Sequence, residues 1–389
     1  MAARGAEVGV SRDSLLEDFA AAAAVAQAHA AEAEAAGRLA EPTVAALIEA
    51  GVARLYLPES LGGLEVDPVT CARVTETLSR GDSAAAWFVM VANASKLMAA
   101  AWPEATVEHV LGGDPDTVVA ASGNRPYSAE AGDGGYYVSG TNSFVSGCHH
   151  ARFLMSPALI GETMHMVLLP MADCEILDNW QALGMRGTGS NDVRADRVWI
   201  PAVQAVAMAE PGAGTPNRYY SGALYRCPGR IVFATYVPAT LVLAEQALLE
   251  LDALAEGKTA YADTRKLKHR SIAQIKGGKA LATFRAARAL FFDALEETWA
   301  RAQRGVAASA LEKGDLYLAG THAVQSSAEV VRLVADAAGT SVIYQGHPLE
   351  RIVRDMETLR HHGFANESRY GSVSQLRWDA ELDYPLMLR

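Results

Sequence analysis

Four of the ten histidines form two adjacent pairs, His149-His150 and His361-His362. Imidazole is the side chain best suited to proton transfer near neutral pH, and it can serve as a base for a phenol or a protonated amine. No carboxylate or cysteine recurs beside these pairs at the spacing of metal ligands, so we predict no metal site. The pairs are therefore candidates for acid–base chemistry or for packing.

An aromatic residue and a hydroxyl stand two residues apart in Phe144-Val145-Ser146-Gly147. A flat, amphipathic ring needs an apolar platform and one well-placed hydrogen-bonding group, and this pair has both. Three further segments accompany it: Asn124-Arg125-Pro126, the glycine-rich run Leu183–Val193, and Pro348–Asp355. Glycines allow the backbone to approach a ligand closely.

The order and spacing of these segments resemble the acyl-CoA dehydrogenase superfamily over nearly the whole chain. The resemblance implies that Phe144 walls the flavin ring and that Ser146 bonds its N5 atom. It further implies contacts to the flavin or to the ligand cleft from a set of other residues, some of them across a subunit boundary. These residues are Asn124, Arg125, Ser190, Arg270, Gln274, Gln345 and Gly346.

One replacement near the end of the chain separates two branches of that superfamily. Dehydrogenases place a catalytic glutamate eight residues after the aspartate that corresponds to Asp355, and here that position is Gly363. Glycine cannot remove a proton. Histidine near this place resembles the two-component flavin-dependent monooxygenases. The resemblance favours His362 as the catalytic imidazole, with His361 second. We also assign His150 to the substrate pocket, and Trp87 because its surroundings are apolar. For His150, packing at the end of a strand is the alternative.

The expected function is therefore that of a flavin-dependent monooxygenase, group D, oxygenase component. It would use O2 and either FADH2 or FMNH2 through a C4a-hydroperoxyflavin to hydroxylate a phenol, indole, polycyclic compound or amine. The chain has no G-x-G-x-x-G followed by a ribose-binding acid, so a separate flavin reductase would supply the reduced flavin. Two alternatives remain: an acyl-CoA dehydrogenase with a relocated base such as Glu367, and a non-catalytic scaffold.

Periodicity predicts the elements that position these residues. Helical patterns fill residues 1–115, short alternating segments separated by turns fill 116–222, and long apolar helical patterns fill 223–389. The prediction is a mainly α protein with a central small β domain and a C-terminal four-helix bundle, an acyl-CoA dehydrogenase-like fold. The run 229–256 reads as one buried helix, and 262–304 as one long segment interrupted only by Gly277-Gly278. The resemblance also implies a homotetramer.

Composition limits the possible partners. The net charge is −11, which disfavours binding to nucleic acid or to an anionic membrane surface. The four cysteines are far apart and the N-terminus lacks the pattern of a signal peptide, so we expect a cytoplasmic protein. No uninterrupted apolar run reaches the length of a membrane span, and we expect no membrane association.

Overall fold

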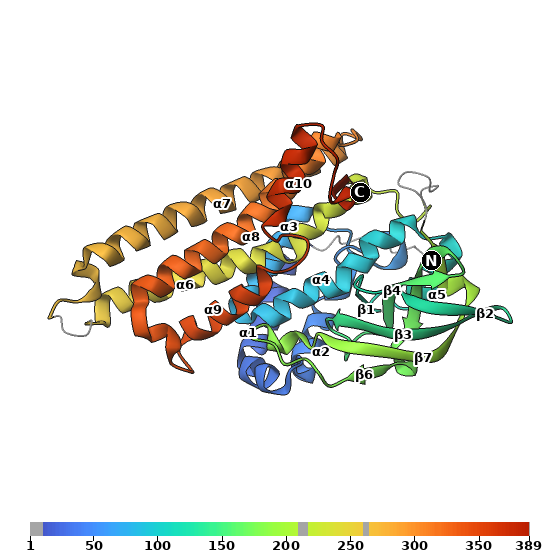
Figure 1. The fold of residues 1–389 in the computed structure, drawn as a ribbon, viewed down its shortest axis with the longest axis horizontal. Coiled ribbons are helices and arrows are strands. Elements are labelled where there is room, and N and C mark those ends of the chain that lie inside the picture. Colours follow the sequence, from blue (N-terminus) through green and yellow to red (C-terminus); the bar gives the residue numbers. More distant parts are fainter. Residues whose placement is uncertain (1–10, 209–216, 260–263, 389) are drawn as a thin grey trace, which may run out of the picture.

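The computed structural model describes residues 11–208, 217–259 and 264–388. Helices form one side of the molecule and a sheet domain the other, with α3 and α4 between them (Figure 1). The N-terminal helices are α1 (Arg12–Ala36), α2 (Glu41–Glu49), α3 (Pro68–Gly81), α4 (Ser83–Met98) and α5 (Glu104–Leu111). Aspartates cap the two central helices. Asp67 accepts from Val69 N and Thr70 N at the start of α3, and Asp82 from Ala84 N at the start of α4.

The middle of the chain forms one eight-stranded sheet. Its order is β6-β7-β3-β2-β4-β5-β8, and β1 pairs with β4 in parallel. The strands are β1 (Val119–Ala121), β2 (Tyr127–Gly132), β3 (Gly135–Val145), β4 (Phe153–Ile160), β5 (Thr163–Pro170), β6 (Glu175–Leu177), β7 (Asn191–Pro201) and β8 (Ala205–Ala207).

The end of β3 is irregular, and this irregularity shapes the candidate site. The register of β3 on β7 shifts between Asn142 and Val145, and Phe144 has φ 60°. A left-handed residue in a strand turns its side chain out of the regular alternation. Gly147 follows with φ 71°, and a Cβ there would lie 2.7 Å from Val91 Cγ1. The strand end can therefore pack directly on α4 only because residue 147 is glycine.

The rest of the chain is helical: α6 (Val237–Gly257), α7 (Ser271–Gln303), α8 (Ala310–Ala338), α9 (Pro348–Leu359) and α10 (Ser368–Arg377). Two sequence-based boundaries were wrong. The apolar run from 229 is a 3-10 segment, Gly229–Thr235, broken at Tyr236 before α6 begins. Conversely, α7 continues through Gly277-Gly278 without interruption. The predicted class, a mainly α protein with a central β domain, is confirmed.

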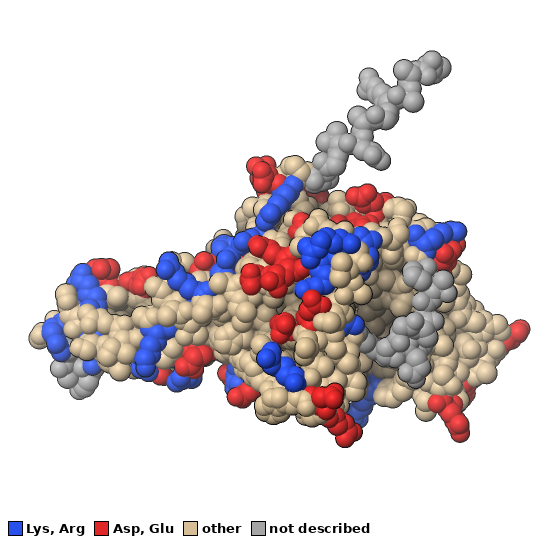
Figure 2. Space-filling view, turned by 90° about the horizontal axis from the view of Figure 1, so that it is seen from above, with Lys and Arg blue, Asp and Glu red and all other residues tan. Residues whose placement is uncertain are grey.

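Two segments, 83–101 and 229–257, have the length and mean hydropathy of a membrane-spanning helix. In their most apolar windows 67% and 83% of the residues are buried inside the protein, which is also what core helices of this composition show. On the face seen in Figure 2, basic and acidic side chains are interspersed over both the helical arm and the main body.

Lys96 is a fully buried cation on α4, and its Nζ donates to the Thr117 carbonyl at 2.7 Å. This bond ties α4 to the chain just before β1. Burial lowers the pKa of Lys96 from 10.5 to about 7, partly opposed by the acids Asp114 and Asp116. The unfolded lysine therefore binds its proton at a higher pH than the folded one, and stability should rise with pH between the two values.

Replacing Lys96 by methionine should remove this dependence. We compare the free energy of unfolding of the wild type with that of Lys96→Met. The difference, wild type minus variant, should increase by about 2 kcal/mol as the pH rises from about 6.5 to about 8.5. Urea unfolding at several pH values measures the difference. The exposed Lys279, replaced in the same way, serves as the control and should give a flat difference. A flat difference for Lys96 as well would contradict the lowered pKa of its buried side chain.

Candidate active site

A cavity of about 310 Å³ opens at the irregular end of β3. Phe144 and Ser190 line it, together with Trp180 from the loop after β6. The Phe144 ring is 64% exposed and lies edge to face with Trp180, with 6.1 Å between ring centres. The remaining lining residues are Ser143, Asn179, Gln181, Ala182 and Asp192. Aromatic surface beside polar groups is what a flat, amphipathic ring requires.

Three hydroxyls form a chain beside this cavity. Ser146 Oγ lies 2.7 Å from Ser190 Oγ, which lies 2.8 Å from Thr188 Oγ1. Thr188 donates to the Met185 carbonyl at 2.8 Å, so its single hydroxyl hydrogen is used there. Ser190 must then donate to Thr188, and Ser146 to Ser190. Ser146 thus presents only lone pairs to a ligand and can act only as an acceptor.

Asn124 and Arg125 are exposed in the loop between β1 and β2, and the buried Asn142 holds this loop in place. The Asn142 amide donates to the Arg125 carbonyl at 2.9 Å, and its oxygen accepts from Ser122 Oγ at 3.0 Å. Its bond to Ser156 Oγ links the same side chain to β4. Asn142 therefore fixes the position of the loop backbone through a buried polar network.

His362 lies in a box of three aromatic rings. The distances from its ring centre are 4.9 Å to Phe364, 5.2 Å to Trp87 and 5.4 Å to Tyr236, all edge to face. Its Nδ1 is buried, and no described residue hydrogen-bonds to it. Burial, and secondarily the positive charge of Arg230, lowers the pKa of His362 to about 4. At neutral pH the imidazole is therefore uncharged.

The two adjacent histidines have opposite environments. His361 is exposed and its Nε2 lies 3.2 Å from Glu357 Oε1, so its ring points to solvent. Both residues follow the end of α9 at Leu359, where the chain turns. Glu367, the alternative base, is also exposed, just before α10. Of the described groups in this stretch, His362 is the one enclosed by the box.

His150 contacts α4 through a different ring from the one that joins the box. Its ring packs on Phe88 with 6.2 Å between centres, and its Nδ1 is 3.8 Å from Glu41. Burial lowers the pKa of His150. Trp87 and Phe88 are neighbours on α4, so this helix contacts the His362 box through one ring and the strand end through the next. These contacts place His150 in the packing of the strand end.

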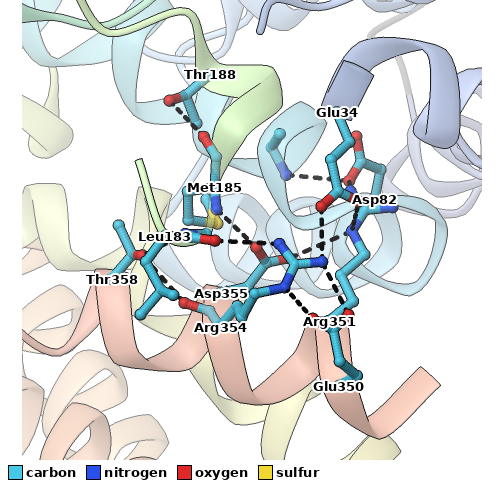
Figure 3. A network of polar contacts seen from close by, with 12 residues as sticks. Glu34, Asp82, Leu183, Met185, Thr188, Glu350, Arg351, Arg354, Asp355 and Thr358 are labelled. Atoms are coloured by element: carbon cyan, nitrogen blue, oxygen red, sulfur yellow. Dashed lines mark hydrogen bonds and ion pairs between the residues drawn. The ribbon is translucent and has the colours of Figure 1, made fainter. Parts of the chain in front are cut away.

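A polar network joins the glycine-rich segment to α9 (Figure 3). Asp355 accepts from Met185 N at 2.6 Å, and Thr358 Oγ1 accepts from Gly184 N at 3.0 Å. Arg351 bonds the buried Asp82, and Arg354 bonds Glu34 at 2.6 Å. Burial raises the pKa of Asp82 to about 6 despite the neighbouring Arg351. The network fixes the position of the glycine-rich segment against α9.

Four predicted flavin contacts lie elsewhere in this chain. Arg270 and Gln274 are at the start of α7, and Gln345 and Gly346 are between α8 and α9, all at the end of the bundle that points away from the sheet (Figure 1). Gln274 donates to the Lys268 carbonyl at 2.9 Å. Within one chain these residues do not meet Ser146.

The sequence interpretation missed several residues of the site: Trp180, Asn179, Tyr236, Phe364 and Arg230. The one available signal for Tyr236 was Pro238, because proline is favoured in the first turn of a helix and therefore marks a start. The other residues carry no local pattern that separates them from core or loop positions.

Comparison with known proteins assigns this fold to a superfamily. Residues 14–105 match the N-terminal domain of acyl-CoA dehydrogenase, and 234–367 match its C-terminal domain. Two solved structures share the fold: XiaF from Streptomyces sp. in complex with FADH2 and glycerol, and the HsaA monooxygenase from M. tuberculosis. The XiaF structure has a TM-score of 0.87 at 22% sequence identity, and the match covers 96% of this chain and 97% of XiaF. The HsaA structure has a TM-score of 0.85 at 23% identity, and the match covers 97% of this chain and 100% of HsaA. The architecture is that of the acyl-CoA dehydrogenase superfamily.

Two relatives of similar sequence identify the branch of the superfamily to which this chain belongs. Indole-3-acetate monooxygenase from Pseudomonas putida is 30% identical over 334 residues, covering 84% of each protein. The protein of the same name from Acinetobacter baumannii is 29% identical, covering 82% of each. The chain belongs to the flavin-dependent monooxygenases of the acyl-CoA dehydrogenase superfamily, as the sequence predicted.

Proposed function

We propose that this protein is the oxygenase component of a two-component monooxygenase that hydroxylates an aromatic small molecule. When bound, reduced flavin activates O2 for transfer to the substrate. Phe144 and Trp180 would cover the flat ring, and Ser146 would meet its N5 atom. The names of the relatives, which specify indole-3-acetate, support an indole or phenol as the substrate; an amine is the second candidate.

The observation that carries this proposal is the environment of His362. An imidazole that is uncharged at neutral pH, enclosed by rings and with Nδ1 unbonded among the described residues, presents a free ring nitrogen to the O–H or N–H group of a phenol or indole. The aromatic walls exclude water, which protects the activated oxygen from loss as hydrogen peroxide. The dehydrogenase alternative needs a carboxylate, and Glu367 faces solvent.

We also propose a cytoplasmic homotetramer that receives FADH2 or FMNH2 by diffusion from a separate reductase. Assembly would bring the Arg270 and Gln345 end of one chain to the flavin of another. Exposed apolar side chains on and beside α7 support this arrangement, because such side chains are usually covered in oligomers. They include Ile272, Ile275, Leu281, Ile343 and Tyr344. Analytical ultracentrifugation tests the stoichiometry.

The test of the proposed reaction mixes the protein with chemically reduced flavin, O2 and indole-3-acetate in a stopped-flow spectrometer. We expect slower flavin reoxidation than in free solution and incorporation of one oxygen atom from O2 into the product. Rapid reoxidation with only hydrogen peroxide formed would refute the proposal. Anaerobic bleaching of bound oxidised FAD by an acyl-CoA would instead establish a dehydrogenase.

The hydroxyl chain predicts selection for reduced flavin. N5 of reduced flavin carries a hydrogen and donates, whereas N5 of oxidised flavin accepts. Because Ser146 can only accept, it fits the reduced form. Thr188→Val breaks the chain, frees Ser146 to donate, and should reduce the ratio of oxidised to reduced flavin dissociation constants roughly tenfold, or about 1.4 kcal/mol.

Fluorescence titration under aerobic and anaerobic conditions measures both constants. Thr141→Val on the exposed side of β3 is the control and should leave the ratio unchanged. An unchanged ratio in the Thr188 variant would show that the chain of three hydroxyls does not determine whether Ser146 donates or accepts.

A further inference from the structure

Two arginines, Arg230 and Arg369, lie over the ring of Tyr384. Arg230 lies in the segment Gly229–Thr235 that precedes α6, and Arg369 lies in α10. Neither guanidinium has a carboxylate of the described residues within 4.0 Å. Both side chains are partly buried. A cation withdrawn from water without a counter-ion is costly, so a site that keeps two of them together favours an anion.

Aromatic rings hold these guanidiniums in place. Arg230 Cζ is 4.4 Å from the ring centre of Phe364, which itself contacts His362, and 5.5 Å from that of Tyr317. Arg369 Cζ is 4.0 Å from the ring of Tyr384. Stacking fixes the plane of a guanidinium but leaves its N–H groups at the edge available for hydrogen bonds. Arg230 is therefore oriented beside the proposed catalytic imidazole.

The donors of Arg230 are poorly used within the chain. Its Nη2 makes two long bonds, 3.4 Å to Tyr384 Oη and 3.3 Å to the Leu386 carbonyl. Its Nε is buried with no partner, as are Nε of Arg369 and Oη of Tyr236, the ring that packs on both His362 and Trp87. Buried polar groups in folded proteins are normally paired. Tyr236 belongs to the His362 box, Arg230 contacts Phe364 of that box, and Arg369 lies over the Tyr384 ring that Arg230 also contacts.

We propose that Arg230 binds the carboxylate of the substrate, which is therefore an aromatic acid with its ring beside His362. This assignment rests on the function proposed above and specifies the class of compound that the enzyme accepts. Nε and one Nη of Arg230 would hold the two carboxylate oxygens, the bidentate geometry that guanidinium favours. Arg369, which lies over the same Tyr384 ring as Arg230, adds positive charge nearby. The surrounding rings favour a carboxylate on an aromatic skeleton over a bare inorganic anion.

The test compares acids with their neutral amides by calorimetric titration of the full-length protein. The pairs are indole-3-acetate with indole-3-acetamide, and phenylacetate with phenylacetamide. In the wild type at least one acid should bind about 10- to 100-fold more tightly than its amide, the range expected for hydrogen bonds to a charged group. Arg230→Gln should abolish the preference, and Arg230→Lys, which keeps the charge but not the fork, should retain part of it.

The control variant is Arg194→Gln, since Arg194 is an exposed arginine on β7 paired with Glu175; it should keep the full preference. Circular dichroism spectra and melting curves show whether each variant is folded. If no acid binds more tightly than its amide, or if Arg230→Gln keeps the preference, the proposal is wrong. It is also wrong if inorganic phosphate competes as strongly as the acids.

Failure of this proposal and failure of the oxygenase proposal give different results. If flavin reoxidation is slow but acid and amide bind equally, the oxygenase proposal stands and the proposed anion site is wrong. Preferential binding of an acid through Arg230, with no effect of the protein on flavin reoxidation, would leave the anion site and remove the oxygenase.

Discussion

His362→Ala should lower the rate of substrate oxygenation by about 10²- to 10⁴-fold, the usual contribution of a general base. The variant removes the imidazole enclosed by the aromatic box, while the hydroxyl chain at Ser146 stays intact. Flavin should therefore still bind and react with O2, and the uncoupled reaction should release hydrogen peroxide. Product yield by chromatography and peroxide by a coupled assay measure the two outcomes in one experiment.

His361→Ala is the matched control, because this neighbouring histidine is exposed and bonds Glu357 at the surface. It should keep wild-type coupling. His362→Asn separates a proton-transfer role from the filling of space: it restores a polar side chain but not a base, so it should remain uncoupled. Full product yield from His362→Ala would remove this residue from the mechanism.

Gly184→Ala should destabilise the protein by about 3 kcal/mol, at the upper end of the range for overpacked sites. A Cβ at residue 184 would lie 2.1 Å from the Arg354 carbonyl oxygen and 2.5 Å from Asp355 N. These are backbone atoms of α9, so no side chain can move aside. The bonds from Gly184 N to Thr358 and from Met185 N to Asp355 would be lost as the two segments separated.

Urea unfolding measures this effect, and flavin titration should show weaker binding because the same segment leads into the wall of the cavity. Gly113→Ala provides the control: a Cβ there meets no atom within 4 Å and its φ is not positive, so it should be nearly neutral. Equal stability of the two variants would mean that α9 can shift without cost.

The order of helices, sheet and helical bundle was predictable from periodicity, because each class of element repeats its pattern many times along the chain. The predicted and observed helix boundaries differ where one or two residues determine whether the helix continues. The break at Tyr236 lies inside an apolar run that continues on both sides, so hydropathy alone could not place it. Gly277-Gly278 did not end α7, because tertiary packing of the helix outweighs the unfavourable helix propensity of two glycines.

The candidate site was predicted in part. Ser146 and Ser190, more than forty positions apart, were identified by the family resemblance, and the structure brings their hydroxyls together. The choice between His361 and His362 required coordinates, because both follow the end of α9 and no periodic rule applies there. Arg230 could not have been chosen from sequence, since only the three-dimensional surroundings show that its charge is unpaired.

The outward position of Phe144 has a thermodynamic consequence. With 64% of Phe144 in contact with water, its apolar ring lies open in the wall of the cavity. A cofactor that covers this surface should bind with a negative change in heat capacity, so that its binding enthalpy becomes more favourable as the temperature rises.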